Sequence, residues 1–259
     1  MPQTFSKKGY ALVLSGGAIR GFAHLGVLKA ISEKNIPVRI ITGSSAGAIA
    51  GFLYASGNYD SAYDKIVNYR LRDLMYLIDL ESPFRGIVRG NKIIKRIIEL
   101  TGKRKLEELL VPMTVSTTNF HTGKNILYSK GDIAKVLKAS FSVPGIFPVV
   151  SHEGYSLMDG DISNSLPIDG IKGSKIICVD VKSSPLSFAK TNSYEAIMKS
   201  VEIMGGRLLK DKLEYARKKK AIIIQPRLEN IDFVSFSQMK KAVNIGYEDA
   251  MKALGSAGL

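Results

Sequence analysis

A serine between small residues stands near the start of the chain, with an apolar segment on either side. Gly43-Ser44-Ser45-Ala46-Gly47 fits the pattern G-x-S-x-G and separates a β-branched run from a segment of helical periodicity. This is the context of a nucleophile elbow, in which Gly43 and Gly47 give clearance and the following helix directs its N-terminal amides at developing negative charge. Ser45 is therefore a candidate nucleophile for acyl transfer, unless the pattern is a chance small-residue turn.

A serine nucleophile needs a base, and the positions of the three histidines argue against a histidine in this role. A hydrolase triad with this elbow runs in the order Ser, Asp or Glu, His, whereas no histidine follows His152. His24 falls on an expected helix and His121 in an expected turn, and we interpret each as a packing or surface residue. Either Ser45 is not catalytic, or its base is a carboxylate.

Glycines also gather between the first apolar run and the helix after it. The segment Ser15-Gly16-Gly17-Ala18-Ile19-Arg20-Gly21 would leave backbone N–H groups free to point into a cleft, as an oxyanion hole or a phosphate cradle requires. A P-loop would need Lys and then Ser or Thr after the last glycine, where Phe22 stands, and the dinucleotide fingerprint would need glycine in place of Ala18. A nucleotide site therefore fits poorly.

Two carboxylates follow one another closely in the second half of the chain, at Asp159 and Asp161. Their surroundings resemble a calcium loop only in part, because Asn164 occupies the position of the obligatory glycine and Gly170 that of the bidentate Glu. Asp159 with Gly160 is by itself most typical of a turn. Alone, this motif does not identify a site.

The elements that must position these residues follow from the apolar pattern. Apolar runs bounded by turn residues alternate with segments of helical periodicity, which predicts an α/β domain. The expected strands are Tyr10–Leu14, Val38–Thr42, Met113–Thr118, Asn125–Tyr128, Lys175–Val181 and Ala221–Gln225, and the expected helices are Arg20–Lys34, Ala46–Ala55 and Ser193–Lys220. In the last helix the expected apolar stripe is Ile197, Val201, Met204, Leu208 and Leu213.

The segment 60–110 is expected to be helical and increasingly basic, with an apolar stripe at Ile93, Ile94, Ile97, Ile98 and Leu100. No internal repeat or composition shift marks a linker. We therefore expect one domain over residues 1–259, with the motifs in a core at about 10–168 and C-terminal helices and a strand in 169–259.

Composition bounds the class of protein. The 259 residues include 37 Lys or Arg against 23 Asp or Glu, and the formal net charge is +14. With 45% hydrophobic and 23% charged residues the chain is globular rather than disordered or collagenous. A single cysteine, Cys178, excludes a disulfide scaffold and favours a reducing compartment. The N-terminus has no signal-peptide-like apolar stretch, so we expect a cytoplasmic protein. The positive charge fits nucleic acid, an anionic membrane or plain solubility.

Taken together, the motifs are far more specific than any one alone. Gly-Gly-x-x-Arg-Gly, then G-x-S-x-G, then Asp-Gly resemble the motifs of the patatin-like phospholipase family, over about Tyr10 to Ile168. Further matching segments are Gly21–Leu28, Val111–Met113, Thr122–Lys124, Lys138–Pro148, and Asn164 with Pro167. The chain resembles a small, single-domain, bacterial-type member. The resemblance implies a three-layer α/β/α fold with a central, mostly parallel sheet and a nucleophile elbow.

The resemblance also implies a Ser–Asp dyad that works without histidine, with Ser45 as nucleophile and Asp159 as general base. The implied oxyanion hole is formed by the amides of Gly16, Gly17 and Ala18, and the motif-supporting residues are Arg20, Gly21, Gly43, Gly47 and Gly160. The implied activity is cleavage of carboxylic esters of lipids, of the phospholipase A, lysophospholipase or esterase type, through an acyl-enzyme. No cofactor and no metal are implied.

Two positions depart from the family pattern. Glycine is usual where Ala18 stands, and since a methyl group makes a positive φ costly, we expect a right-handed or extended backbone there. The residue two positions after the presumed base is Asp161 instead of glycine or alanine. We expect its side chain to point to solvent; if it faces the site instead, its charge would raise the pKa of Asp159.

Because the expected substrate is a lipid ester and the chain is basic, the expected partner is an anionic membrane surface. The protein is expected in the cytoplasm, with peripheral attachment to the inner face of the membrane as a further option. From Glu81 to Leu110 there are eight Lys or Arg against four Glu, and the region from Ile78 to Ile98, with Phe84, Ile87 and Val88, is our expected lid or docking surface. The basic stretch from Ala196 to Arg227 fits a solvated helix face at least as well. The oligomeric state is unknown.

The competing function class is a basic membrane- or partner-binding module with this fold and little catalytic turnover. Nucleic acid is not an expected partner, because the chain has no Trp, no basic stripe interleaved with aromatic residues and no helix-turn-helix signature. The presence of both Ser45 and Asp159 favours the enzyme over the binding module.

Overall fold

The computed structural model describes residues 5–81, 87–173, 175–182, 193–231 and 236–259, except for the side chains of 193–202 and 204. Within these residues one mixed, mostly parallel sheet has the strand order β5-β6-β3-β2-β1-β7-β8, with β4 paired to β3. The strands are β1 (Phe5–Leu14), β2 (Val38–Ser44), β3 (Met113–Asn119), β4 (Asn125–Tyr128), β5 (Val150–His152), β6 (Tyr155–Asp159), β7 (Ile176–Val179) and β8 (Ile222–Ile224).

The strands β3, β2, β1, β7 and β8 run parallel, while β4, β5 and β6 pair antiparallel. Because the ends of parallel strands share an edge of the sheet, the residues after β1, β2 and β7 come together in space. The register aligns Leu14 at the end of β1 with Gly43 of β2 and with Val179 of β7. The glycine loop and the serine motif are thereby neighbours.

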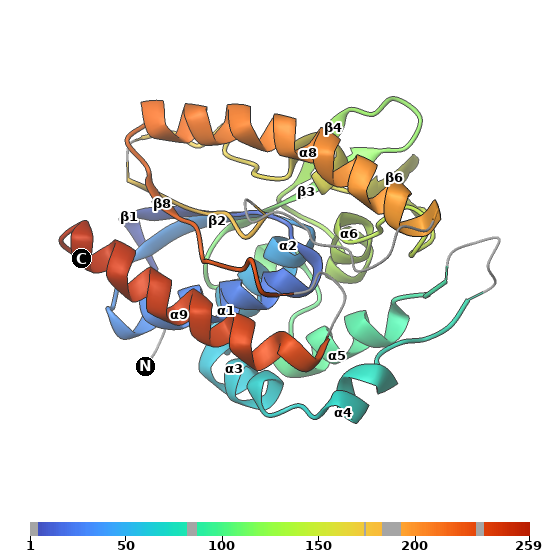
Figure 1. Cartoon of the computed structure of the whole chain (residues 1–259), viewed down its shortest axis with the longest axis horizontal. Coiled ribbons are helices and arrows are strands. Elements are labelled where there is room, and N and C mark those ends of the chain that lie inside the picture. The colour runs from blue at the N-terminus through green and yellow to red at the C-terminus, as the bar shows by residue number, and fades with distance from the viewer. Residues whose placement is uncertain (1–4, 82–86, 174, 183–192, 232–235) are drawn as a thin grey trace.

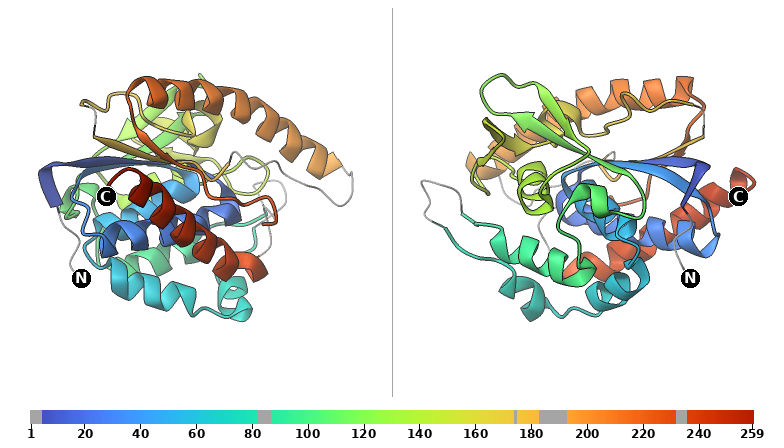
Figure 2. Two further views of the ribbon diagram at one scale, coloured as in Figure 1. Left: turned by 60° about the vertical axis from the view of Figure 1, so that its left-hand side comes forward. Right: turned by 180° about the vertical axis from the view of Figure 1, so that it is seen from behind.

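Helices cover both faces of the sheet, which gives three layers (Figure 1). The helices are α1 (Ala23–Glu33), α2 (Ser45–Ala55), α3 (Tyr59–Val67), α4 (Leu71–Tyr76), α5 (Asn91–Thr101), α6 (Ile133–Ser140), α7 (Asp161–Asn164), α8 (Ser193–Lys218) and α9 (Met239–Ser256), with 3-10 turns η1 (Ala18–Phe22), η2 (Leu106–Glu108) and η3 (Phe236–Gln238). In all views α8 lies on one face of the sheet and α1, α2 and α9 on the other (Figure 2).

Successive side chains of β1 point alternately into two clusters of buried apolar residues. Leu12 and Leu14 join the larger cluster under α1, α2 and α9, while Ala11 and Val13 join the smaller one under α8. All four side chains are fully buried. A strand buried on both faces reads as a continuous apolar run, which is why this element was recognisable in the sequence.

The helices α1 and α9, from opposite ends of the chain, lie side by side (Figure 1). Two glycines allow this contact. A Cβ atom at Gly26 would lie 1.9 Å from the Val243 carbonyl oxygen, and a Cβ at Gly246 would lie 2.1 Å from that of Ala23. The C-terminal helix thus packs directly on the helix that follows the glycine loop.

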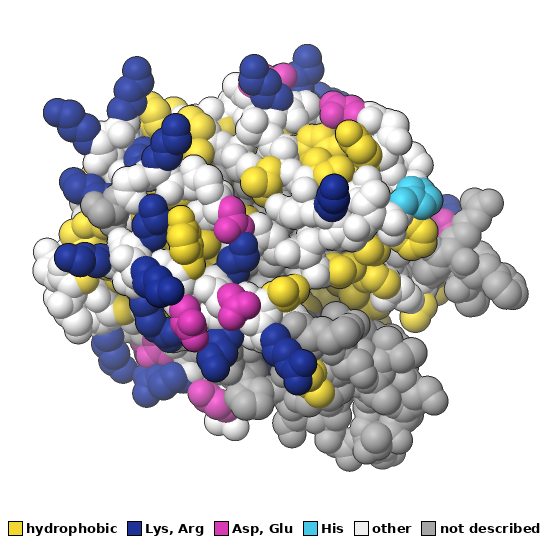
Figure 3. Space-filling model, turned by 90° about the horizontal axis from the view of Figure 1, so that it is seen from above, with side chains coloured by type: hydrophobic (Ala, Val, Ile, Leu, Met, Phe, Trp, Pro, Cys, Tyr) yellow, Lys and Arg dark blue, Asp and Glu magenta, His cyan; other side chains and the backbone are white. Residues whose placement is uncertain are grey.

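The outer face of α8 carries the second basic stretch. Leu209, Leu213 and Ala216 are buried against the sheet, and the exposed positions of the helix include Arg207, Lys210, Arg217 and Lys218. Seen from above, Lys and Arg side chains gather towards one end of this surface (Figure 3). The exposed charges and the buried Leu209 and Leu213 agree with a solvated helix face, although Ile203, Leu208 and Tyr215 are exposed as well.

Several expectations need correction. The apolar stripe of α8 runs through Leu209 and not through Leu208, which is 42% exposed. The reason is helical spacing, because the buried residues Leu209, Leu213 and Ala216 are four and three positions apart. The other expected stripe residues, Ile197, Val201 and Met204, lie outside the described side chains. The hairpin of β5 and β6 was not expected, because these strands are short. The stripe of α5 is as expected, with Ile94, Ile97 and Leu100 buried. Among the described helices, none has both the length and the apolarity needed to cross a bilayer.

Candidate active site

Ser45 occupies a sharp turn between β2 and α2. Its φ of 51° lies in the left-handed region, which is strained for a residue with a side chain and is typical of functional turns. A Cβ atom at Gly43 would lie 2.7 Å from the Gly47 carbonyl oxygen, and a Cβ at Gly47 would lie 2.4 Å from that of Ser15. The clearance expected of both glycines is therefore needed, and the turn is the expected elbow.

Asp159 meets Ser45 from the other part of the sheet. It is the last residue of β6, which pairs antiparallel with β3, so that Asp159 lies opposite Thr117. The Ser45 Oγ donates a hydrogen bond of 2.9 Å to Asp159 Oδ2, and both residues are buried, at 6% and 2% exposure. The structure thus joins two motifs that are 114 residues apart in the sequence.

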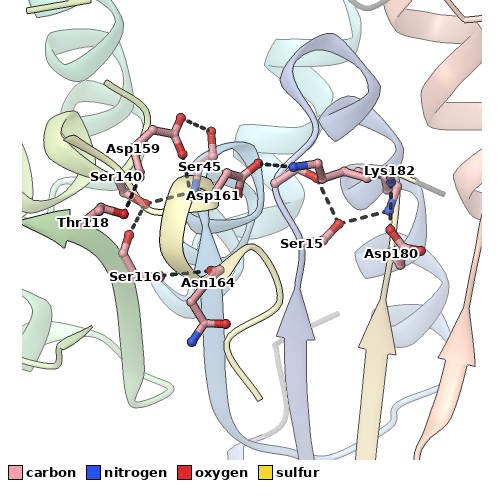
Figure 4. A network of polar contacts seen from close by, with 12 residues as sticks. Ser15, Ser45, Ser116, Thr118, Ser140, Asp159, Asp161, Asn164, Asp180 and Lys182 are labelled. Carbon is pink, nitrogen blue, oxygen red and sulfur yellow. Dashed lines mark hydrogen bonds and ion pairs between the residues drawn. The ribbon is translucent and has the colours of Figure 1, made fainter. Parts of the chain in front are cut away.

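Hydroxyl groups that the sequence analysis did not single out hold this pair in place (Figure 4). The Ser140 Oγ accepts a hydrogen bond from the Ser45 N–H at 2.9 Å and donates to the Ser116 carbonyl oxygen at 2.7 Å. The Thr118 Oγ1 donates to the backbone oxygen of Asp159 at 2.7 Å. The run Ser116-Thr117-Thr118, polar yet fully buried in β3, was the signal that could have revealed Ser116 and Thr118; Ser140 lies at the end of α6.

Asp161 faces the site, so the expectation that it points to solvent was wrong. Its Oδ2 lies 3.1 Å from the Nζ of Lys182, and the two side chains are 18% and 13% exposed. Its backbone N–H donates to Asp159 Oδ1 at 2.8 Å. Asp161 is the first residue of the short helix α7. Its side chain points to the edge of the sheet, where Lys182, a residue that follows β7, forms an ion pair with it (Figure 4).

Burial and charge both act on Asp159. Burial raises the pKa of its carboxyl well above the usual value, and the Asp161 carboxylate raises it further, while the hydrogen bonds from Asp161 and Ser45 and the charge of Lys182 act in the opposite direction. Burial alone would lower the pKa of Lys182, but Asp161, Asp159 and Asp180 together raise it. Lys182 is therefore a cation.

The glycine loop adopts a different backbone from the one expected at Ala18. Its φ is 47°, in the left-handed region, at the start of η1. The expectation of a right-handed or extended backbone was wrong, because tertiary packing of the loop outweighs a local cost of about 1 kcal/mol. A Cβ atom at Gly17 would lie 2.5 Å from the Val181 side chain and one at Gly21 2.3 Å from Ala46 Cβ, so the loop is tightly enclosed.

The three expected oxyanion donors differ in whether their N–H groups are already hydrogen-bonded. The Gly16 N–H already donates to the Ser165 carbonyl oxygen at 3.2 Å. The N–H groups of Gly17 and Ala18 donate to no group in the described part of the chain. Ala18 also lines the cavity beside Ser45. Of the three expected donors, Gly17 and Ala18 are therefore the ones whose N–H groups have no acceptor in the described part of the chain.

Two further motif residues hold the loop and the turn in place. Arg20 is 2% exposed, and its Nε donates to the Ile231 carbonyl oxygen at 3.0 Å, which ties η1 to the C-terminal part of the chain. A Cβ at Gly160 would lie 2.3 Å from the Ser116 carbonyl oxygen. Glycine at 160 thus lets the segment after Asp159 pass directly over β3.

The histidines are placed as expected of packing or surface residues. His24 is fully buried in α1, and its Nε2 lies 2.7 Å from the Ser15 carbonyl oxygen. Because that oxygen only accepts, Nε2 carries the proton. Burial lowers the pKa of His24 to about 4, against smaller opposite effects of Ser15, Asp180 and Asp161. His121 lies exposed in the turn between β3 and β4. Neither histidine is hydrogen-bonded to Ser45.

An apolar cavity of about 290 Å³ has Ser45 in its lining and extends between α1, α2, α4 and α5. The lining residues are almost all aliphatic or aromatic and include Ile49, Leu53, Leu77, Ile93, Ile97, Phe141 and Phe147. Such a cavity accommodates a hydrocarbon chain, whereas a polar chain would find few hydrogen-bonding groups in it. A serine in a nucleophile elbow that lines an apolar cavity can attack a carbonyl group whose acyl chain lies inside.

Comparison with known proteins adds to this picture. The profile of the family described as patatin-like phospholipase matches residues 12–171. An uncharacterised NTE family protein of Mycobacterium tuberculosis is 32% identical over 163 residues, which cover 63% of this chain and 45% of that protein. Lysophospholipase NTE1 of Kluyveromyces lactis is 27% identical over 95% of this chain and 19% of its own length. The chain thus spans less than half of the length of either relative.

Among solved structures, VipD of Legionella pneumophila is similar in fold. It matches with a TM-score of 0.56 at 18% identity, over 96% of this chain and 67% of that chain. At this identity the match concerns the fold alone, and it agrees with the mixed, mostly parallel sheet described above.

Proposed function

From the premise that this chain belongs to the patatin-like phospholipase family, we propose that it is a serine lipid acyl hydrolase in which Ser45 and Asp159 form the catalytic dyad. The observation that carries the proposal is the 2.9 Å hydrogen bond from Ser45 Oγ to a buried carboxylate, made in a strained elbow that lines an apolar cavity. The substrate class is carboxylic esters of lipids, such as phospholipids or lysophospholipids.

The first half of the reaction forms an acyl-enzyme. Asp159 accepts the hydroxyl proton of Ser45 while Oγ attacks the ester carbonyl carbon. The carbonyl oxygen becomes an oxyanion, and in this proposal the free amides of Gly17 and Ala18 and the amide of Ala46, next after the nucleophile, stabilise it. The tetrahedral intermediate then collapses, the ester C–O bond breaks, and Asp159 returns the proton to the leaving alcohol.

The second half repeats these steps with water. Asp159 takes a proton from the water molecule that attacks the acyl carbon, and the Ser45 oxygen leaves with that proton as the fatty acid is released. A carboxylate at its ordinary pKa is a weak base for a hydroxyl group, so the raised pKa of Asp159 favours this role. Each oxyanion donor supplies about 3 kcal/mol of transition-state stabilisation.

The apolar cavity supports an acyl chain as the part of the substrate held most closely. Burial of each methylene group contributes about 0.8 kcal/mol, and the cavity walls offer few polar groups besides Ser45, Tyr69 and Arg96. The head group would then lie outside the cavity, at the surface next to Ser45. This arrangement fits an enzyme that selects the acyl chain more strictly than the alcohol.

A fluorophosphonate probe tests the proposal together with turnover of a panel of lipid esters. We expect the wild type to be labelled at one serine and both labelling and turnover to be lost in Ser45→Ala. In Asp159→Asn the hydroxyl loses its base, and we expect turnover to fall by about a thousandfold or more. Labelling that persists in Ser45→Ala, or a wild type that binds lipid without turnover, would contradict the proposal; the latter favours a binding module.

An anionic membrane is the proposed place where the substrate is met. Exposed apolar side chains gather on α4 and just after it, next to the cavity, and form what we name the docking face: Leu71, Met75, Tyr76, Leu80 and Ile87, each between 49% and 72% exposed. Cations flank it. Arg72 and Arg89 have side chains 75% and 53% exposed and are paired with Asp73 and Glu81, and the Lys92 Nζ lies 4.2 Å from the Tyr76 ring centre. Apolar insertion with basic neighbours suits an anionic lipid surface. Phe84 of the expected surface lies outside the described residues.

A further inference from the structure

A part-buried ion pair adjoins the Ser45–Asp159 pair and takes no part in the chemical steps proposed above. It joins Asp161, at the start of α7, to Lys182, which follows β7, with Oδ2 and Nζ 3.1 Å apart. Figure 4 shows the Lys182 side chain reaching across from the β7 side to Asp161. Burying two charges costs several kcal/mol per ion before their attraction is counted. A pair in this position therefore calls for an explanation beyond stability.

Asp161 is held between the base and the glycine loop. Its N–H donates to Asp159 Oδ1 at 2.8 Å, which leaves Oδ2 of Asp159 for Ser45. On its other side, a Cβ atom at Gly16 would lie 1.9 and 2.0 Å from the two carboxylate oxygens of Asp161. Asp161 thus contacts both the carboxylate that receives the proton and the loop expected to receive the oxyanion.

The charges around Asp159 come from three elements. Asp161 on α7 raises its pKa in addition to burial, and Lys182 after β7 lowers it. Asp180, also at the end of β7, accepts hydrogen bonds from the Lys182 N–H at 2.8 Å and from Gln225 at 2.9 Å, and it acts on Lys182. His24 on α1 is neutral near pH 7 because its pKa is about 4. The field at Asp159 is therefore set mainly by Asp161 and Lys182, which act in opposite directions.

We propose that Asp161 and Lys182 are positioning residues that together set the pH at which Asp159 becomes able to accept the Ser45 proton. This inference rests on the proposed role of Asp159 as base. With Asp161 alone, two close carboxylates would share one buried site and Asp159 would stay protonated up to higher pH. With Lys182 alone, Asp159 would ionise at lower pH and be a weaker base. Together, Asp161 makes Asp159 a stronger base, and Lys182 keeps it ionised at neutral pH.

The pH dependence of kcat/KM with a soluble p-nitrophenyl ester tests this, because its acid limb reports the ionisation of the base in the free enzyme. In Lys182→Met the limb moves to higher pH by about one unit or more, because a stabilising cation is lost. In Asp161→Asn, which keeps the backbone hydrogen bond, it moves to lower pH, and the maximal rate falls because the base is weaker. In the double variant the two effects oppose each other, and the limb returns towards the wild-type pH.

Lys182→Arg is the matched control, because it keeps the positive charge and should keep the acid limb at the wild-type pH. Limbs that stay in place in all variants, or that move in the same direction in Lys182→Met and Asp161→Asn, would overturn the inference. If Lys182→Met does not fold, Asp161→Asn and the double variant still decide the direction.

Fluorophosphonate labelling in the same samples separates this inference from the proposed function. A wild type that is labelled at Ser45 and turns over ester, but whose variants show unmoved limbs, contradicts only the role of Asp161 and Lys182. A wild type without labelling at Ser45 contradicts the dyad itself.

Discussion

Two residues with side chains have left-handed backbones at this site, Ala18 and Ser45, with φ of 47° and 51°. Each costs about 1 kcal/mol in the folded state. The two positions are the start of the turn that carries free amides and the nucleophile itself. Two residues that the proposed reaction uses are therefore locally strained, as Asn35, Glu153 and Lys220 are elsewhere in the described chain, and the packing of Gly17 against Val181 and of Gly21 against Ala46 holds the loop in place.

His24 makes stability depend on pH. Its pKa is about 4 in the folded protein against 6.5 in the unfolded chain, so the unfolded state binds the proton more tightly. Stability from this residue is complete above pH 6.5 and is lost as the pH falls towards 4, by about 3 kcal/mol in total. We expect denaturant titrations of His24→Gln to show a smaller loss of unfolding free energy between pH 7 and 4.5 than the wild type shows.

The matched control is His121→Gln, in an exposed turn, which should lose stability on acidification as the wild type does. An equal acid dependence of His24→Gln and the wild type would show that the buried imidazole does not cause it.

Among the elements, the elbow depends on how closely α2 approaches β1. Gly47 lies in the first turn of α2, and a Cβ there would lie 2.4 and 2.5 Å from the carbonyl oxygens of Ser15 and Leu14. Both are backbone atoms that cannot move aside easily. The glycine is therefore required by the contact between two elements and not by helix formation, which alanine would favour.

Gly47→Ala should therefore destabilise the protein by about 2 kcal/mol and lower ester turnover, because overpacking outweighs a gain of about 1 kcal/mol in helix propensity. Gly206→Ala is the matched control: it is also a helical glycine, exposed on α8, with no atom within 4 Å of the added Cβ. It should raise stability by about 0.5–1 kcal/mol. Thermal melts with calorimetry check both values, and a stabilised Gly47→Ala would contradict the packing argument.

On the scale of the whole molecule, the charge of +14 is distributed over faces with different surroundings. The outer face of α8 is basic, and its apolar residues Leu209 and Leu213 are turned to the core. The docking face, on the other side of the sheet (Figure 1), combines cations with exposed apolar side chains beside the cavity. Ile203, Leu208 and Tyr215 on α8 are exposed as well, so what distinguishes the docking face is its place beside the cavity, where insertion into a lipid interface would bring the substrate to Ser45.

Replacement of Met75 and Leu80 by Glu tests the docking face. Both side chains are exposed, at 58% and 71%, and neither lines the cavity. We expect co-sedimentation with vesicles of phosphatidylcholine and phosphatidylglycerol to fall by about tenfold or more, because apolar insertion is lost and negative charge is added. An unchanged melting temperature shows that the fold is retained.

Ile203→Glu is the control, since Ile203 is 53% exposed on α8, and its binding to the same vesicles should stay close to that of the wild type. Vesicle binding that is lost in Ile203→Glu and kept in the Met75 and Leu80 variant would place the membrane contact on the α8 side instead.

Much of the arrangement was readable from local patterns. The elbow at 43–47, the strands β1, β2 and β3 and the helix α2 follow from apolar runs, small residues and periodicity, which act within a few residues of one another. The pairing of Ser45 with Asp159 was expected from the family resemblance of ordered motifs, since nothing local joins residues so far apart in the chain. The short strands β5 and β6 were missed because a few residues carry little periodic signal.

The sequence by itself determined which residues are able to do the chemistry, because side-chain types and turn-forming glycines are local properties. Only the tertiary structure decided the direction of Asp161, the left-handed backbone of Ala18, and the meeting of Lys182 with the site. Each of these depends on contacts between β1, α7 and the end of β7, which are distant in the chain. Such contacts can outweigh local preferences of about 1 kcal/mol, because packing and buried charge contribute more than that at a single position.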